Sequence, residues 1–68
     1  MEIIAKRIKE IRLENQLTQT EFAKILYVSQ DNVSLWETGK SVPTIQHVIL
    51  ISKHFKVSSD YILGLSDF

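Results

Sequence analysis

Residues 17–38 read LTQTEFAKILYVSQDNVSLWET, and this stretch decides the fold of the chain. Two of its hydroxyl residues, Thr18 and Ser29, each follow an apolar residue and precede another by four positions. A hydroxyl in this setting accepts a hydrogen bond from a free backbone N–H at a helix start, while the two apolar residues close over it. Glu21 also completes a capping box with Thr18. The stretch therefore predicts helices over about residues 19–26 and 30–38.

The link between these two predicted helices is very short, because only residues 27–29 separate them. So short a link makes the helices cross sharply, which is the geometry of a helix-turn-helix unit over about residues 18–38. The helical period gives the second helix two sides, one with Val33, Trp36 and Glu37 and the other with Asp31, Ser34, Leu35 and Thr38. The latter side is polar and short-chained. It suits a DNA major groove, because no long stem keeps the helix from the base edges.

Similar signals on either side of this unit predict three more helices. Ile4, Ile8 and Ile11 form one stripe of a helix over about residues 2–15. Thr44 directly follows Pro43 and caps a fourth helix, and Ser58 caps a fifth. No segment alternates in the manner of a strand. The sequence thus predicts an all-α fold, a compact five-helix bundle.

The core of this bundle is predicted from the apolar residues on the inward stripes. They are Ile4, Ile8, Ile11, Leu17, Phe22, Ala23, Leu26, Val33, Trp36, Val48, Ile51, Phe55, Val57, Ile62 and Leu63. In the fourth helix we expect Ile45 to face inward with Val48 and Ile51, and Leu50 to face outward. His47 and His54 are expected to be ordinary surface residues of this helix.

Length and composition limit the classes of function. The chain has 68 residues, which is one small domain over residues 1–68, and it has no cysteine and only two histidines, too few for a zinc site. Its start does not resemble a signal peptide and its longest apolar run is far too short to span a membrane, so a cytoplasmic protein is expected. Eight basic and eight acidic residues cancel to a net charge of zero. DNA binding would therefore need a local basic face.

Several short motifs occur in a distinctive order. They are Arg12, the run Leu17-Thr18-Gln19-Thr20-Glu21-Phe22-Ala23, then Val28-Ser29-Gln30, Trp36-Glu37-Thr38-Gly39-Lys40 with Pro43, Phe55-Lys56-Val57-Ser58 and Tyr61-Ile62-Leu63. In this order and spacing the chain resembles the Cro and phage-repressor helix-turn-helix family, also called the XRE family, over nearly its whole length. The resemblance implies a five-helix bundle of the lambda-repressor-like DNA-binding type, with double-stranded operator DNA as the partner and no cofactor or metal.

The resemblance also implies roles for individual residues. Base contacts are expected from Gln30, Asp31, Ser34 and Leu35, and phosphate contacts from Thr18, Gln19, Asn32, Thr38 and Lys40. A glutamine bonds adenine at N6 and N7, a carboxylate accepts from the cytosine N4 amino group, and a leucine contacts a thymine methyl. The N-terminus of the helix that begins near Gln19 favours a phosphate. Arg12 and Glu37 are expected to form an ion pair that ties the first helix to the third.

These observations lead to a sequence-specific transcriptional regulator, a repressor that blocks polymerase by occupying its operator. The alternative is an antitoxin or adaptor whose helix-turn-helix fold mainly binds a partner protein. An enzyme is not expected, because the sequence lacks a glycine-rich phosphate loop, metal-ligand spacing and a Ser/His/Asp arrangement. No small-molecule or membrane site is evident. The protein is expected to be bacterial or phage-encoded and nucleoid-associated when bound.

Apolar residues near the C-terminal end predict an association surface. Leu65 and Phe68 add apolar surface after the fifth helix, and Leu50 is expected to be exposed on the fourth. Related repressors dimerise near this end, which places two recognition helices in successive major grooves about 34 Å apart. A weak homodimer through the C-terminal end is therefore expected.

Overall fold

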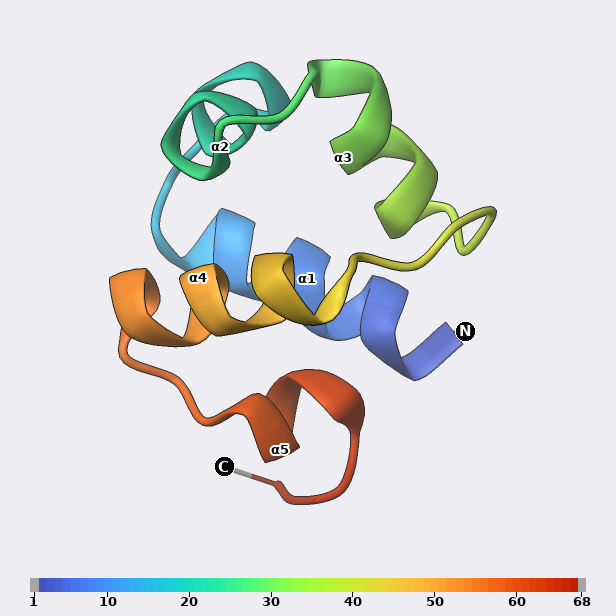
Figure 1. The fold of residues 1–68 in the computed structure, drawn as a ribbon, viewed down its shortest axis with the longest axis vertical. Coiled ribbons are helices and arrows are strands. Elements are labelled where there is room, and N and C mark those ends of the chain that lie inside the picture. Colours follow the sequence, from blue (N-terminus) through green and yellow to red (C-terminus); the bar gives the residue numbers. More distant parts are fainter. Residues whose placement is uncertain (1, 68) are drawn as a thin grey trace.

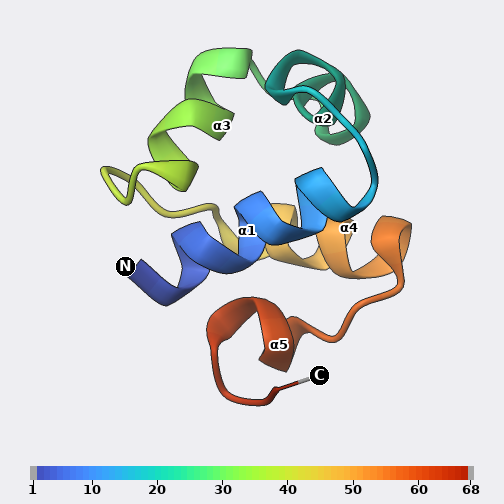
Figure 2. The same cartoon turned by 180° about the vertical axis from the view of Figure 1, so that it is seen from behind.

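The fold is all-α, as the sequence predicts. The computed structural model describes residues 2–67, and within this range it contains five α-helices and no strand. The helices are α1 (Glu2–Glu14), α2 (Gln19–Leu26), α3 (Gln30–Glu37), α4 (Ile45–Phe55) and α5 (Ser59–Leu63). Figures 1 and 2 show α2 and α3 at one end of the molecule and α5 at the other, with α1 and α4 between them.

Each helix after α1 begins at a hydroxyl residue that caps it. Thr18 Oγ1 accepts from the backbone N–H of Glu21 at 3.1 Å, and the Glu21 carboxylate accepts from the Thr18 N–H at 2.9 Å, completing the capping box. Ser29 and Ser58 cap α3 and α5 in the same way. Thr44 caps α4, where His47 takes the part that Glu21 has in α2. Local capping chemistry therefore fixes where the helices start.

The core lies where all five helices meet. Its largest fully buried side chains are Ile8, Phe22, Leu26, Val33, Ile51 and Ile62. The Phe22 and Phe55 rings stack with their centroids 5.3 Å apart, which joins α2 to the end of α4. The predicted core residues Leu17, Phe55, Val57 and Leu63 are only partly buried and pack around it, whereas Ala5, which was not predicted, is buried.

The prediction for Ile45 is wrong, because its side chain is 67% exposed. At about 100° per residue, Ile45 lies roughly 90° from the centre of the buried stripe of Val48, Ile51 and Phe55. It therefore stands at the edge of the stripe, at the first position of α4. Leu50 is 39% exposed, as predicted.

Two further expectations concern membrane-spanning segments and the C-terminal end. None of the helices within residues 2–67 has the length and apolar character that crossing a membrane requires. Leu65 is 74% exposed near the C-terminal end. Phe68, the other C-terminal residue predicted to take part in association, lies outside the described residues.

Candidate nucleic-acid interface

The turn between α2 and α3 makes the two helices cross. Tyr27 follows α2 in a left-handed conformation with φ 59° and ψ 40°. This reverses the chain, and the Val28 N–H then bonds the Ala23 carbonyl at 3.0 Å. Ser29 caps α3 immediately afterwards. The chain thus passes from one helix to the next with almost no intervening loop, and α3 lies across the end of the molecule (Figure 1).

The two sides of α3 differ as the sequence pattern indicates. Val33 and Trp36 are 0% and 4% exposed and anchor the helix on the core. The predicted base-contacting residues lie away from this anchor: Gln30, Asp31 and Leu35 are exposed and Ser34 is partly buried. Trp36 also lies 5.1 Å, centroid to centroid, from the ring of His47. His47 is consequently partly buried against α3 and is not the ordinary surface residue expected from the sequence.

An ion pair with largely buried side chains joins α1 to the end of α3. Arg12 Nε donates to Glu37 Oε2 at 2.7 Å and Arg12 Nη2 donates to Glu37 Oε1 at 3.0 Å. The two side chains are only 11% and 4% exposed. Arg12 Nη1 donates to the Leu17 carbonyl at 2.9 Å, so the same guanidinium also holds the segment that leads into α2. The pair therefore connects α1, α3 and the segment that leads into α2.

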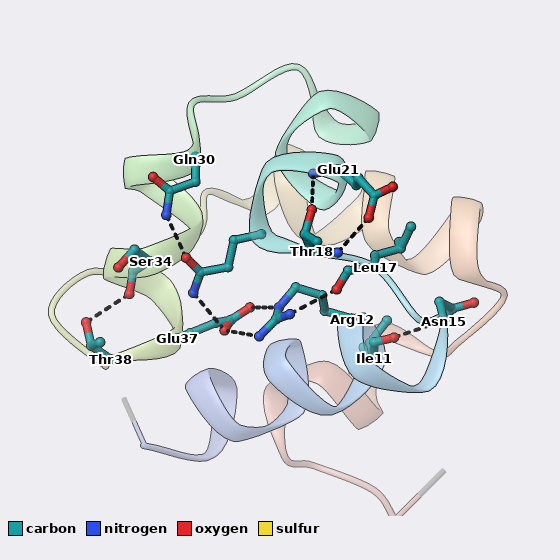
Figure 3. A network of polar contacts seen from close by, with 11 residues as sticks. Ile11, Arg12, Asn15, Leu17, Thr18, Glu21, Gln30, Ser34, Glu37 and Thr38 are labelled. Carbon is teal, nitrogen blue, oxygen red and sulfur yellow. Dashed lines mark hydrogen bonds and ion pairs between the residues drawn. The ribbon is translucent and has the colours of Figure 1, made fainter.

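Two glutamines extend this ion pair to the exposed start of α3. Gln19 Nε2 donates to Glu37 Oε1 at 3.1 Å, and Gln30 Nε2 donates to Gln19 Oε1 at 2.6 Å. Figure 3 shows the resulting chain of polar contacts from Arg12 through Glu37 to Gln30. Sequence reasoning assigned Gln19 and Gln30 separate roles and missed their contact. The short link predicts that α2 and α3 cross, but no local pattern shows which of their side chains meet.

The predicted phosphate-contacting residues differ in exposure. Thr18, Asn32, Thr38 and Lys40 are exposed, and Gln19 is partly buried. The Thr38 hydroxyl donates to the Ser34 carbonyl at 2.9 Å, so in this conformation its proton is already used. The backbone N–H groups of Lys40 and Ser41 both bond the Leu35 carbonyl, which folds the loop back on the end of α3.

Within residues 2–67 no group of His, Cys, Asp or Glu side chains is placed to hold a metal ion. A surface cavity of about 320 Å³ lies between the end of α1, the link from α4 to α5 and the C-terminal segment, lined by residues that include Glu14, Lys56 and Tyr61. It includes none of the predicted DNA-contacting residues.

Comparison with known proteins places this geometry in context. A family model described as helix-turn-helix matches residues 8–62. The chain is 38% identical over 59 residues to the HTH-type transcriptional activator BcrR of Enterococcus faecalis, covering 87% of this chain and 29% of that protein. It is 37% identical over 62 residues to the antitoxin PezA of Streptococcus pneumoniae, covering 91% of this chain and 39% of that protein. The chain therefore spans well under half the length of either relative.

The fold also has a close counterpart among solved structures. It is similar to the P22 c2 repressor protein in its crystal structure with a synthetic operator, with a TM-score of 0.82 and 26% sequence identity. The match covers 91% of this chain and 94% of that one.

Proposed function

The chain belongs to the XRE-type helix-turn-helix family whose model matches residues 8–62, and from this premise we propose that it is a sequence-specific, double-stranded DNA-binding transcriptional regulator. The observation that carries the proposal is the outward side of α3. Its exposed side chains are polar except for Leu35, while Val33 and Trp36 hold the opposite side on the core. A recognition helix needs both properties, because it must enter the major groove and keep its register there.

Four residues of α3 are proposed to contact bases. Gln30 bonds adenine, and Asp31 accepts a hydrogen bond from a cytosine N4 amino group. Ser34 bonds a base edge and Leu35 contacts a thymine methyl. Leu35 is 39% exposed, which leaves an apolar surface of suitable size for a methyl group. The four side chains together define the bases that the operator must present.

A second set of residues is proposed to hold the DNA backbone. Thr18 and Gln19 lie at the N-terminus of α2, where free N–H groups and the helix dipole favour a phosphate. Asn32, Thr38 and Lys40 contact the backbone beside α3. The Thr38 hydroxyl must exchange its bond to the Ser34 carbonyl for one to a phosphate oxygen when it does so. Because the net charge is zero, these local contacts carry the electrostatic attraction.

We propose repression as the mode of regulation, with the bound chain blocking polymerase from its operator. The similarity to a phage repressor that is solved with a synthetic operator supports this mode. The protein is proposed to be encoded by a bacterium or a phage and to act in the bacterial cytoplasm. It is associated with the nucleoid when it is bound to DNA. It is proposed to have no enzymatic activity.

A second candidate function is supported by the 37% identity to the antitoxin PezA. In that case the helix-turn-helix fold mainly binds a partner protein. Selection from a random double-stranded DNA library, followed by binding measurements at several salt concentrations, separates the two functions. A regulator enriches one motif, and its affinity for that motif falls as the salt concentration rises. Absence of any enriched motif would contradict the regulator and favour the partner-protein function.

We further propose that the chain forms a weak homodimer through its C-terminal end. Leu65 is 74% exposed there, Leu50 is 39% exposed on α4, and Phe68 follows in the sequence. So few apolar residues make a small interface, which a palindromic operator would reinforce. Sedimentation with and without selected DNA tests this. A strictly one-to-one complex on a palindromic site, unchanged by Leu65→Asp, would contradict it.

A further inference from the structure

Tyr27, which forms the turn between α2 and α3, lies almost wholly in solvent. Its side chain is 89% exposed, more than any other large apolar or aromatic side chain within residues 2–67. Within the same range its hydroxyl has no hydrogen-bond partner. The other tyrosine of the chain is engaged on both counts: the Tyr61 ring lies 4.1 Å from the Arg7 guanidinium, and its hydroxyl donates to Glu10 at 3.0 Å. Tyr27 therefore keeps its hydroxyl for a partner outside the protein.

The backbone of the turn does not favour a tyrosine either. Tyr27 has φ 59° and ψ 40°, a left-handed conformation that glycine adopts freely and that crowds the Cβ of any other residue. Gln16 and Lys56 are left-handed in the same way after α1 and α4, and both are exposed polar residues. At Tyr27 an aromatic ring is added to the strained position although it packs on little of the protein. Strain of this kind is retained where a side chain has a function.

The turn lies close to the point where the proposed recognition helix enters the major groove (Figure 1). Ser29 caps α3 and Gln30 is its first residue. Three residues of chain span at most about 10 Å, so the Cα atom of Tyr27 lies within that distance of the Cα atom of Gln30. The major groove is about 12 Å wide, so its middle is about 6 Å from either sugar-phosphate wall. When Gln30 contacts a base, the Tyr27 side chain is therefore within reach of one wall.

The charges around the turn leave a use for a neutral donor. The charged residues nearest to Tyr27 in the sequence are Lys24 and Asp31, and both are exposed. A phosphate beside the turn is attracted by the one and repelled by the other. Phosphate oxygens accept hydrogen bonds from tyrosine hydroxyls, and such a bond does not depend on the balance of charge.

The turn also holds Tyr27 in a fixed place relative to α3. Its N–H donates to the Lys24 carbonyl at 3.3 Å, and the N–H of Val28 donates to the Ala23 carbonyl at 3.0 Å. Because these bonds restrain the backbone on both sides of the ring, little conformational freedom is lost when the side chain meets a partner.

We propose that the Tyr27 hydroxyl donates a hydrogen bond to a phosphate oxygen of the operator, at the wall of the major groove beside the start of α3. This inference rests on the proposed DNA-binding function. A phosphate contact carries no base information, so its loss weakens the operator and its single-base variants by the same factor. An uncharged donor releases no counter-ions, so its loss leaves the salt slope unchanged. The two properties together distinguish Tyr27 from a residue that reads a base and from a cation.

The experiment first selects an operator with the full chain and then titrates it, and its single-base variants, with wild type, Tyr27→Phe and Tyr61→Phe. Tyr61→Phe is the matched control, because it loses the same hydroxyl in α5, at the end of the molecule away from α2 and α3. We expect Tyr27→Phe to bind every duplex about tenfold more weakly than wild type, with the salt slope unchanged, and Tyr61→Phe to bind within about twofold of wild type.

A second measurement locates the phosphate. In a series of operators, one phosphate at a time is replaced by an uncharged methylphosphonate. At the phosphate that Tyr27 contacts, the replacement is expected to weaken wild type more than Tyr27→Phe, because the variant has already lost the bond. At every other phosphate the two proteins are expected to lose the same factor.

Tyr27→Gly separates binding from folding. Glycine adopts φ 59° without strain, and a side chain that is 89% exposed contributes little packing, so we expect the urea midpoint to be equal to or higher than that of wild type. The affinity for the operator is nevertheless expected to fall about tenfold, as in Tyr27→Phe.

Three outcomes would overturn the inference. If Tyr27→Phe bound the operator as tightly as wild type, the hydroxyl would make no contact with DNA, and the proposed function would stand. If Tyr27→Phe changed the order of preference among the single-base variants, the hydroxyl would read a base and not a phosphate. If wild type selected no motif at all, the proposed function would fail and the inference with it.

Discussion

Arg12 and Glu37 are 25 residues apart in the chain and are joined by two hydrogen bonds, with the carboxylate side chain only 4% exposed. Removing one partner of such a pair leaves an uncompensated buried charge, whereas removing both leaves an apolar contact. Substituting one residue of the pair is therefore expected to lower stability more than substituting both with apolar residues.

We expect Arg12→Met to lower the free energy of unfolding by about 3–5 kcal/mol, because Glu37 is left buried without a counter-ion. The double variant Arg12→Met, Glu37→Met is expected to recover part of this loss, since the Leu17 carbonyl and the Gln19 amide still lose their partners. Urea unfolding of wild type, both single variants and the double variant measures the coupling. A single-variant loss of less than about 1 kcal/mol would instead mean that the pair behaves like a solvated surface pair.

The helix starts and the ion pair differ in how they could be predicted. Thr18, Ser29, Thr44 and Ser58 cap helices through contacts with residues close in sequence, so local spacing was sufficient and the predicted starts are confirmed. The pairing of residues 25 positions apart has no local signal. It was expected only from the resemblance to a family.

The errors have physical reasons as well. Ile45 lies at the edge of the buried stripe of α4. The spacing of apolar residues shows where such a stripe runs but not how wide it is. The partial burial of His47 against Trp36 and the contact between Gln19 and Gln30 both depend on how α3 packs on its neighbours. The short link predicts that α2 and α3 cross sharply, but which side chains meet across the crossing is set by the packed core as a whole.

The two glycines allow a matched test of close packing. Gly39 and Gly64 both have positive φ, 77° and 79°, so alanine is strained at either position. A Cβ at Gly39 would have no atom within 4 Å, whereas a Cβ at Gly64 would lie 2.6 Å from Ile3 Cγ1. We therefore expect Gly64→Ala to lower the free energy of unfolding by about 1–3 kcal/mol more than Gly39→Ala does. Thermal and urea unfolding of the two variants measure the difference, and equal losses would show that Ile3 moves aside freely.

The capping box of α2 should make stability depend on pH. The backbone N–H of Thr18, and then its side chain, hydrogen bond the carboxylate and hold the pKa of Glu21 below its ordinary value of 4.5. A lowered folded-state pKa stabilises the fold above the unfolded-state value, and this contribution is lost as the pH falls through the folded-state pKa. We expect Glu21→Gln, which keeps the box without titrating, to lose less stability than wild type when the pH is lowered below about 4.5. Urea midpoints measured across this range test it, and parallel curves for the two proteins would contradict it.

Gln30 and Lys40 should differ in what they contribute to DNA binding, although both are exposed, one at the start of α3 and the other just after its end. Gln30 is at the start of α3, where its amide donates to Gln19, and Gln30→Ala is expected to remove about 1–3 kcal/mol of discrimination at one base pair. Lys40 lies in the loop after α3, and its charge attracts the phosphate backbone whatever the base sequence. Lys40→Ala is therefore expected to weaken all duplexes by a similar factor and to reduce the salt slope by about one.

Titrating each variant against the selected operator, single-base variants of it and random duplex at several salt concentrations distinguishes the two effects. Leu13→Ala is a control on the surface of α1, where the side chain is 55% exposed outside the proposed interface. If Gln30→Ala and Lys40→Ala lowered the affinity for operator and random DNA by the same factor, neither residue would have the role proposed for it. No change in salt slope is expected for Gln30→Ala, because an uncharged side chain releases no counter-ions when it binds.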